Sequence, residues 1–293
     1  MPNQTDHNAA YGFKWAGLSD PALAVAGSDD WPTVSVQRTA TSGPGSAEPE
    51  AEPEQVGEDA ASIQTLAARV RLDRPSSKLE IRAPNALPVA DVIHPVLWPA
   101  AAVFARWHEH ETFHAGAVSF DGHGAWAILG AHGAGKSSLL AMLALEGVEV
   151  LVDDLLVVAG KRCFAGPRCI DLRPEAAEAL SIGPDAPLVR SSERRRLTLP
   201  PCSGEYGLRG FLHLQWGADV RLERLLPVQR LPLLLDHRRV IGLGADFEHV
   251  LDLVALPVIR LTRPPDWHAS RRLAADLERS LFELQDPQLL NAC

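Results

Sequence analysis

A glycine-rich run that ends in a lysine and a serine points most directly to chemistry. Residues 130–137 read Gly-Ala-His-Gly-Ala-Gly-Lys-Ser and fit the pattern G-x-x-x-x-G-K-[ST]. In such a loop the backbone N–H groups converge on phosphate oxygens, the lysine reaches the outer phosphates and the hydroxyl can bind Mg²⁺. The lysine is Lys136, one of only four in the chain. The predicted nucleotide-binding residues are Gly130, His132, Gly133, Ala134, Gly135, Lys136, Ser137 and Ser138.

Two adjacent aspartates, Asp153 and Asp154, follow the next apolar run, VEVLV. Open α/β sheets place ligand-facing residues at the carboxyl ends of their strands. One carboxylate there can hold Mg²⁺ together with Ser137, and the other can accept a proton from a hydroxyl nucleophile. After an arbitrary strand such a pair would be a solvated turn, but beside a phosphate-binding loop it predicts a catalytic site.

Two further features have both a structural and a functional interpretation. His114 begins the apolar run before the glycine-rich loop and would lie beside the aspartates if the two strands are neighbours. A single histidine is more often structural, and the chain has eleven. The run Arg194-Arg195-Arg196 could clamp a phosphate, although a charge run is more often a solvated loop.

The segments around these residues alternate between strand and helix patterns. Residues 113–120 and 126–130 predict two strands joined by a turn at 121–124, and residues 148–152 predict a third. Between them, residues 136–145 predict a helix. The loop thus follows a strand and opens a helix, which is the context that a phosphate-binding loop requires. Residues 95–109 have the apolar spacing of a further amphipathic helix.

The N-terminal part predicts a small β-rich unit. Residues 68–72 and 78–82 alternate apolar and charged side chains around a Pro-Ser-Ser turn, which is a hairpin pattern. Residues 39–62 are rich in Pro, Gly, Ala, Ser and acidic residues, so they are expected to form a flexible acidic loop. The predicted division is an N-terminal unit at residues 1–91 and an α/β domain at residues 92–293.

The composition narrows the class of protein. The 293 residues include 46% apolar and 22% charged ones, which is typical of soluble globular proteins. A net charge of −9 argues against generic binding to nucleic acid or to an anionic membrane. The polar opening residues lack the features of a signal peptide, so a cytoplasmic location is expected. Four cysteines without zinc-site spacing predict free thiols.

These motifs resemble the kinase domain of HPr kinase/phosphorylase and its smaller relatives, the HPr-kinase-like serine kinases that include lasso-peptide precursor kinases. The resemblance rests on Phe113-His114-Ala115-Gly116, on the loop GAHGAGKS and on the strand ending LVDD. It implies that His114 and Asp154 form the catalytic couple, with Asp154 as the proton acceptor. Ile170-Asp171-Leu172-Arg173 stands where the family has a metal-binding acidic residue, so the resemblance makes Asp171 a candidate second metal residue.

The fold expected from this resemblance is an α/β P-loop kinase domain of the type shared with phosphoenolpyruvate carboxykinase. The expected reaction is transfer of the γ-phosphoryl group of ATP, with Mg²⁺, to a serine of a peptide or small protein, such as the precursor of a ribosomally made peptide. The predicted catalytic residues are His114, Asp154 and Lys136, and the predicted metal residues are Ser137, Asp153 and Asp171. A homo-oligomer is compatible with this prediction. A small-molecule kinase and a non-catalytic nucleotide-binding module fit the same motifs.

Overall fold

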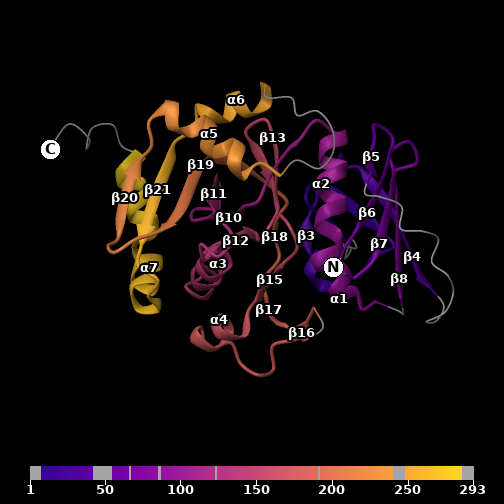
Figure 1. The fold of residues 1–293 in the computed structure, drawn as a ribbon, viewed down its shortest axis with the longest axis horizontal. Helices are drawn as coiled ribbons and strands as arrows, with labels where there is room; N and C mark the ends of the chain where they lie inside the picture. Colours follow the sequence, from indigo (N-terminus) through magenta and orange to yellow (C-terminus); the bar gives the residue numbers. More distant parts are fainter. Residues whose placement is uncertain are drawn as a thin grey trace, which may run out of the picture.

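The chain folds into a mixed α/β structure (Figure 1). The computed structural model describes residues 8–41, 55–65, 67–84, 87–122, 124–190, 192–239 and 248–285. Two of its sheets carry most of the strands: an N-terminal sheet, and a central sheet that contains the glycine-rich loop.

The N-terminal sheet has the strand order β1-β2-β4-β8-β7-β6-β5. Its predicted hairpin is confirmed, because β7 and β8 pair antiparallel with Val70 opposite Ile81. The alternation of the sequence buries one face of this hairpin, where Val70 and Leu79 are fully enclosed. The bounds are β1 Ala9–Ala10, β2 Phe13–Ala16, β4 Thr33–Thr41, β5 Gln55–Val56, β6 Ala60–Gln64, β7 Arg69–Asp73 and β8 Lys78–Pro84.

Both ends of the segment predicted as an acidic loop form strands. Its first residues belong to β4, and its last residues form β5 and most of β6. Ala61 and Ile63 occupy alternate positions of β6, and both side chains are buried in the N-terminal sheet. Their burial stabilises this strand. Residues 42–54 lie outside the described residues.

A helical segment at Val89–Trp107 follows the N-terminal sheet and consists of α1 Val89–Asp91, η2 Val92–Val96 and α2 Leu97–Trp107. The helix predicted at 95–109 corresponds to α2. His94 has an extended backbone inside this segment, with φ −151° and ψ 116°, as expected for a residue before a proline. This is the one candidate membrane span within the described residues by length and composition, and 67% of its apolar window is buried inside the protein, as in a core helix.

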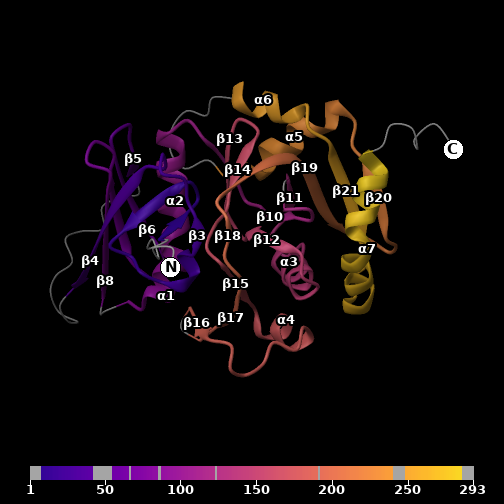
Figure 2. The same cartoon turned by 180° about the vertical axis from the view of Figure 1, so that it is seen from behind.

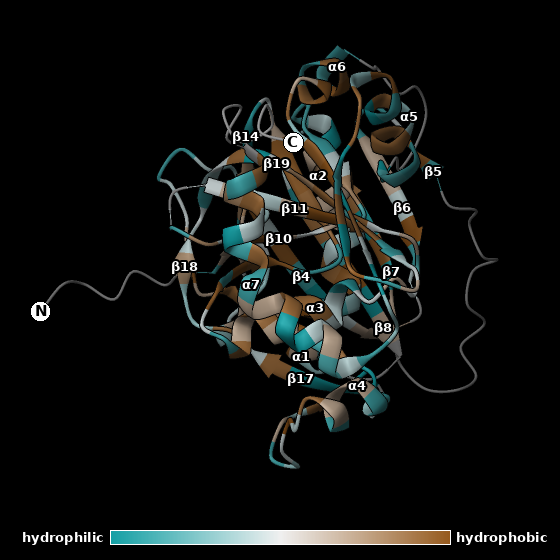
Figure 3. Ribbon diagram, turned by 90° about the vertical axis from the view of Figure 1, so that its left-hand side faces the viewer, coloured by the Kyte–Doolittle hydropathy of each residue, from teal (hydrophilic) through white to brown (hydrophobic). Residues whose placement is uncertain are grey.

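The central sheet has the order β12-β10-β11-β19-β14-β13-β9, with β21 beside β19 and β20 beside β21. Its strands are largely apolar (Figure 3). The run predicted as one strand at 113–120 is two strands, because the chain changes neighbours at His114: β9 pairs with β13, whereas β10 pairs with β11 and β12. The bounds are β9 Glu111–Phe113, β10 Gly116–Ser119, β11 Gly124–Gly130, β12 Glu149–Val152, β13 Leu156–Ala159, β14 Arg162–Phe164, β19 Glu205–Trp216, β20 Arg221–Arg224 and β21 Val258–Arg263.

Helices pack against the central sheet, and a separate small sheet lies beside it. Figures 1 and 2 both place α5 and α6 at one end of the molecule and α4 with β16 and β17 at the other. A short sheet of order β15-β17-β16 carries Asp171 and Arg196. The bounds are η1 Pro21–Leu23, β3 Val25–Ala26, α3 Lys136–Leu145, β15 Cys169–Leu172, α4 Pro174–Ala179, β16 Leu188–Val189, β17 Arg194–Thr198, β18 Cys202–Ser203, α5 Pro227–His237, α6 Glu248–Val254 and α7 Trp267–Gln285.

Two hydrophobic clusters form the core. One packs α3 and α7 against the central sheet. The other contains the N-terminal sheet, α2 and further strands of the central sheet, so it includes residues from both sides of the predicted boundary at residue 91. β3 also pairs with β18, and Tyr11 N–H donates to the carbonyl of Ala165 at 2.7 Å. The N-terminal unit is therefore packed directly onto the domain that carries the candidate site, and its division at residue 91 stays a prediction.

Candidate active site

The glycine-rich loop joins β11 to α3, as the sequence predicts. Gly133 and Gly135 have φ of 81° and 79°, a left-handed backbone that favours glycine. A Cβ at Gly133 would meet nothing within 4 Å, so this part of the loop has open space for a ligand. Because α3 begins at Lys136, its first N–H groups are available to an anion.

Lys136 lies against the loop that it follows. Its Nζ donates to the carbonyl of Gly130 at 2.7 Å and to that of Ala131 at 3.3 Å. Burial lowers the pKa of Lys136, and the negative charges of Asp154 and Asp153 oppose that shift. The ammonium group is therefore close to both aspartates and is hydrogen-bonded to backbone carbonyls. It can exchange these hydrogen bonds for bonds to a phosphate.

Ser137 and Asp153 form the hydroxyl–carboxylate pair that the sequence predicted for Mg²⁺. Ser137 Oγ donates to Asp153 Oδ1 at 3.1 Å, and the N–H of Asp154 donates to the same oxygen at 3.0 Å. Burial, followed by the charge of Asp154, raises the pKa of Asp153 well above its usual range. Oxygen ligands suit Mg²⁺, and a divalent cation would offset the cost of this buried carboxylate, so the pair fits the ion.

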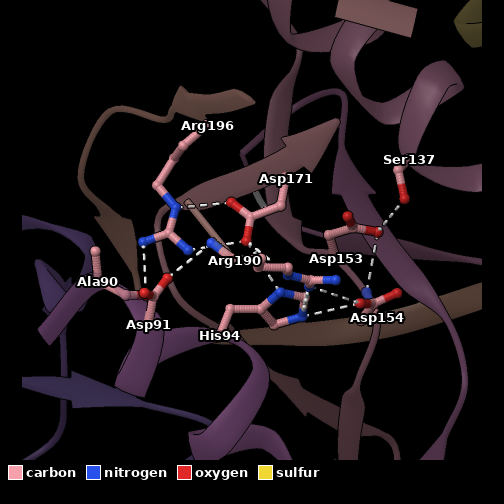
Figure 4. Close-up of polar contacts among 9 residues, drawn as sticks. All are labelled: Ala90, Asp91, His94, Ser137, Asp153, Asp154, Asp171, Arg190 and Arg196. Atoms are coloured by element: carbon pink, nitrogen blue, oxygen red, sulfur yellow. Dashed lines mark hydrogen bonds and ion pairs between the residues drawn. The ribbon is translucent and has the colours of Figure 1, made fainter. Parts of the chain in front are cut away.

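Asp154 is the residue of the aspartate pair that faces away from the core. Its φ of 72° is unusual for a residue with a side chain, and such strain is found at sites where the surrounding structure imposes it. Its Oδ2 lies 2.8 Å from His94 Nε2 and 3.7 Å from Arg190 Nη2 (Figure 4). The side chain is 32% exposed, so a substrate hydroxyl can reach it.

Asp171 anchors a buried polar network behind Asp154. Its two oxygens accept from Arg196 Nε at 2.7 Å and Arg196 Nη2 at 2.9 Å. Arg190 Nε and His94 Nδ1 lie 3.2 Å from Oδ2 of the same carboxylate (Figure 4). This arrangement differs from the metal-binding role expected for Asp171, because guanidinium and imidazole groups already occupy its oxygens. Within the described residues no group of three or more His, Cys, Asp or Glu could hold a metal ion.

His114 lies beside Asp154 but contacts its backbone. His114 Nδ1 is 3.2 Å from the Asp154 carbonyl oxygen, and a carbonyl only accepts, so Nδ1 donates and Nε2 carries the free lone pair. Burial and the charge of Lys136 lower the pKa of His114, and the charge of Asp154 opposes that shift. The lowered pKa favours the neutral ring. The expected contact between His114 and the Asp154 carboxylate is absent among the described contacts, and His94 makes that contact instead.

The remaining predicted residues lie around the loop. His132 is exposed, with Nε2 3.4 Å from Arg173 Nη2, and Ser138 is half-buried in the first turn of α3. The carbonyl of Ala134 accepts from Arg263 Nη2 at 3.2 Å. Of the arginine run, Arg196 is buried on Asp171, whereas Arg195 donates to the carbonyls of Pro184 and Ala186.

His94 and Arg190 contact Asp154, although no motif in the sequence marks either residue. His94 lies far from the motifs along the chain, and the Arg190 side chain belongs to a loop in which Arg190 and Ser192 both have a left-handed backbone. The one local signal was the His-Pro dipeptide, which fixes the extended backbone of His94 but says nothing of its partners.

No family model and no curated protein matches the chain. Among solved structures it is similar to the HPr(Ser) kinase/phosphatase from Coxiella burnetii, with a TM-score of 0.31 and 12% identity over 60% of this chain and 99% of that chain. A likeness at this score transfers no property between the two proteins, and function follows from the site itself.

Proposed function

We propose that the protein is an ATP-dependent kinase that transfers the γ-phosphoryl group to a hydroxyl. The observation that carries this proposal is the hydrogen bond from Ser137 to Asp153, next to the half-exposed carboxylate of Asp154. A glycine-rich loop, a hydroxyl–carboxylate pair for Mg²⁺ and an adjacent base are the parts that phosphoryl transfer requires.

The donor site uses the loop and the first turn of α3. The loop N–H groups and Lys136 would hold the phosphates, and Ser137 with Asp153 would hold the Mg²⁺ that accompanies ATP. When bound, Mg²⁺ neutralises charge on the phosphate oxygens. Lys136 would exchange its contacts with Gly130 and Ala131 for phosphate oxygens, which costs little because its ammonium carries three donors.

The acceptor site centres on Asp154. The acceptor oxygen forms a bond to the γ-phosphorus, the bond to the β–γ bridging oxygen breaks, and ADP leaves with that electron pair. The acceptor proton goes to the Asp154 carboxylate. His94 and Arg190 hold this carboxylate in place, and most of the catalysis is positioning and charge neutralisation.

The proposed acceptor is a serine of a peptide or small protein, which the sequence resemblance supports. The test is incubation of the protein with ATP and with serine peptides, small proteins and small alcohols, followed by mass spectrometry of the acceptors. We expect an added phosphate on a serine, and its loss in Asp154→Asn. Phosphate on small alcohols alone would make the protein a small-molecule kinase, and ATP binding without ADP release would make it a non-catalytic module.

A further inference from the structure

An exposed tryptophan stands on the rim of the glycine-rich loop. Trp216 is the last residue of β19, and 41% of its surface is exposed. Its indole Nε1 donates to the carbonyl of Gly133 at 3.1 Å. None of the proposed phosphate, metal or proton-transfer roles uses this side chain, and a large apolar ring at a ligand-binding edge needs an explanation.

The ring is fixed before any ligand arrives. The guanidinium carbon of Arg263 lies 4.4 Å from the ring centroid, over one face. Arg263 is itself buried, and it donates to the carbonyls of Ala134 and Gly135 and to Ser270 Oγ. Arg263 covers one face of the ring and the indole nitrogen is tied to Gly133, so the opposite face is the one available for stacking. A ring held in this way loses little conformational entropy on stacking.

The order of the strands places Trp216 at the end of the site opposite to Asp154. β12, which precedes Asp153, runs parallel to β11, because both pair antiparallel with β10. On the other side, β19 is parallel to β11 and to β21, with Gly130 opposite Leu214 and Trp216 opposite Arg263. The parallel strands β12, β11 and β19 end at the same edge of the central sheet. The aspartates, the loop and Trp216 therefore lie in this order along that edge.

We infer that Trp216 is the platform on which the nucleobase of the phosphoryl donor stacks. This inference rests on the proposed function and specifies its donor: a nucleoside triphosphate rather than inorganic polyphosphate. With the γ-phosphate beside Ser137, Asp153 and Asp154, the rest of the donor extends past the loop toward Trp216. Because every base has a π-face, stacking on Trp216 predicts little discrimination between ATP and GTP.

The test compares the binding of MgATP, MgGTP and inorganic triphosphate with Mg²⁺ by calorimetry. For the unsubstituted chain we expect both nucleotides to bind about tenfold more tightly than triphosphate. Trp216→Ala should remove that gap, and its effect on the affinity for triphosphate should be no larger than that of Trp216→Phe. Trp216→Phe, which keeps a ring but loses the N–H donor to Gly133, should keep most of the gap. The control is Phe282→Ala, which truncates an exposed aromatic residue near the C-terminal end of α7 and should behave like the unsubstituted chain.

Each other outcome has a separate meaning. Equal weakening of ATP and triphosphate in both Trp216 variants would show that the residue only braces the loop, and would overturn the inference. Equal binding of ATP and triphosphate by the unsubstituted chain would overturn it as well, while leaving the phosphate site intact. Absence of binding for all three ligands would overturn the proposed function itself.

Discussion

His94 Nε2 lies 2.8 Å from Oδ2 of Asp154, and this contact joins the helical segment after the N-terminal sheet to the second residue after β12. The same ring reaches Asp171 through Nδ1 at 3.2 Å. His94 thus fixes the carboxylate that would receive the acceptor proton, and the helical segment that precedes the central sheet completes the candidate site.

Removing the His94 ring should impair turnover more than nucleotide binding. In His94→Ala we expect kcat to fall at least about tenfold with the KM for ATP within a few-fold, because Asp154 loses the contact that orients it. His94→Gln, which retains an N–H donor, should lose less. The exposed His249→Ala is the matched control. A normal kcat per folded molecule in His94→Ala would show that the ring only supports the fold.

Asp154→Asn should leave MgATP binding within a few-fold and lower turnover by about 10² or more, since the amide keeps the shape but cannot accept the proton. Calorimetry and a coupled ADP assay measure the two quantities. If binding is lost while turnover per bound ATP is normal, Asp154 is a metal ligand and Asp153 is the base.

Asp171→Asn should destabilise the protein by about 3 kcal/mol, because it leaves the buried guanidinium of Arg196 without its charge partner. The corresponding change in an exposed pair, Glu223→Gln beside Arg260, should cost less than about 1 kcal/mol. Chemical denaturation of both variants measures the difference. Equal effects would mean that the network around Asp171 is not structural.

Acid should destabilise the fold in part through His110, which stacks on Phe164. Burial, with the charges of His108 and Arg162 adding to it, lowers the pKa of His110 to about 4. As the pH falls from about 6.5 to about 4, the unfolded chain binds a proton that the folded chain does not, so stability is lost across this window. His110→Gln should therefore show a smaller drop in melting temperature between pH 7 and pH 5. An unchanged drop would contradict the half-buried, neutral state of His110.

The glycine-rich loop and its flanking elements could be predicted from the sequence because their signals are local. The positive φ of Gly133 and Gly135, the helix that starts at Lys136 and the contact between Ser137 and Asp153 all follow from a motif and from strand order. The β7–β8 hairpin was predictable for the same reason, since alternation and a turn suffice.

The rest depended on contacts between distant segments. His94 and Asp171 are 77 residues apart, and only tertiary packing brings them together. The sequence shows Asp171 as an acidic residue but does not show that Arg196 binds its carboxylate, because that pairing forms only in the fold. Pro232 lies inside α5, where a proline usually indicates a helix end. β5 and the first residues of β6 lay within a segment whose composition suggested a loop.

Calorimetric titration of MgATP into the unsubstituted chain and into Lys136→Ala measures whether the loop at Lys136 binds the phosphates of ATP. We predict saturable binding that weakens at least about tenfold in the variant, with an unchanged circular dichroism spectrum, because the Lys136 ammonium contacts loop carbonyls rather than the apolar core. Equal affinities in the two proteins, with both folded, would contradict phosphate binding by this loop.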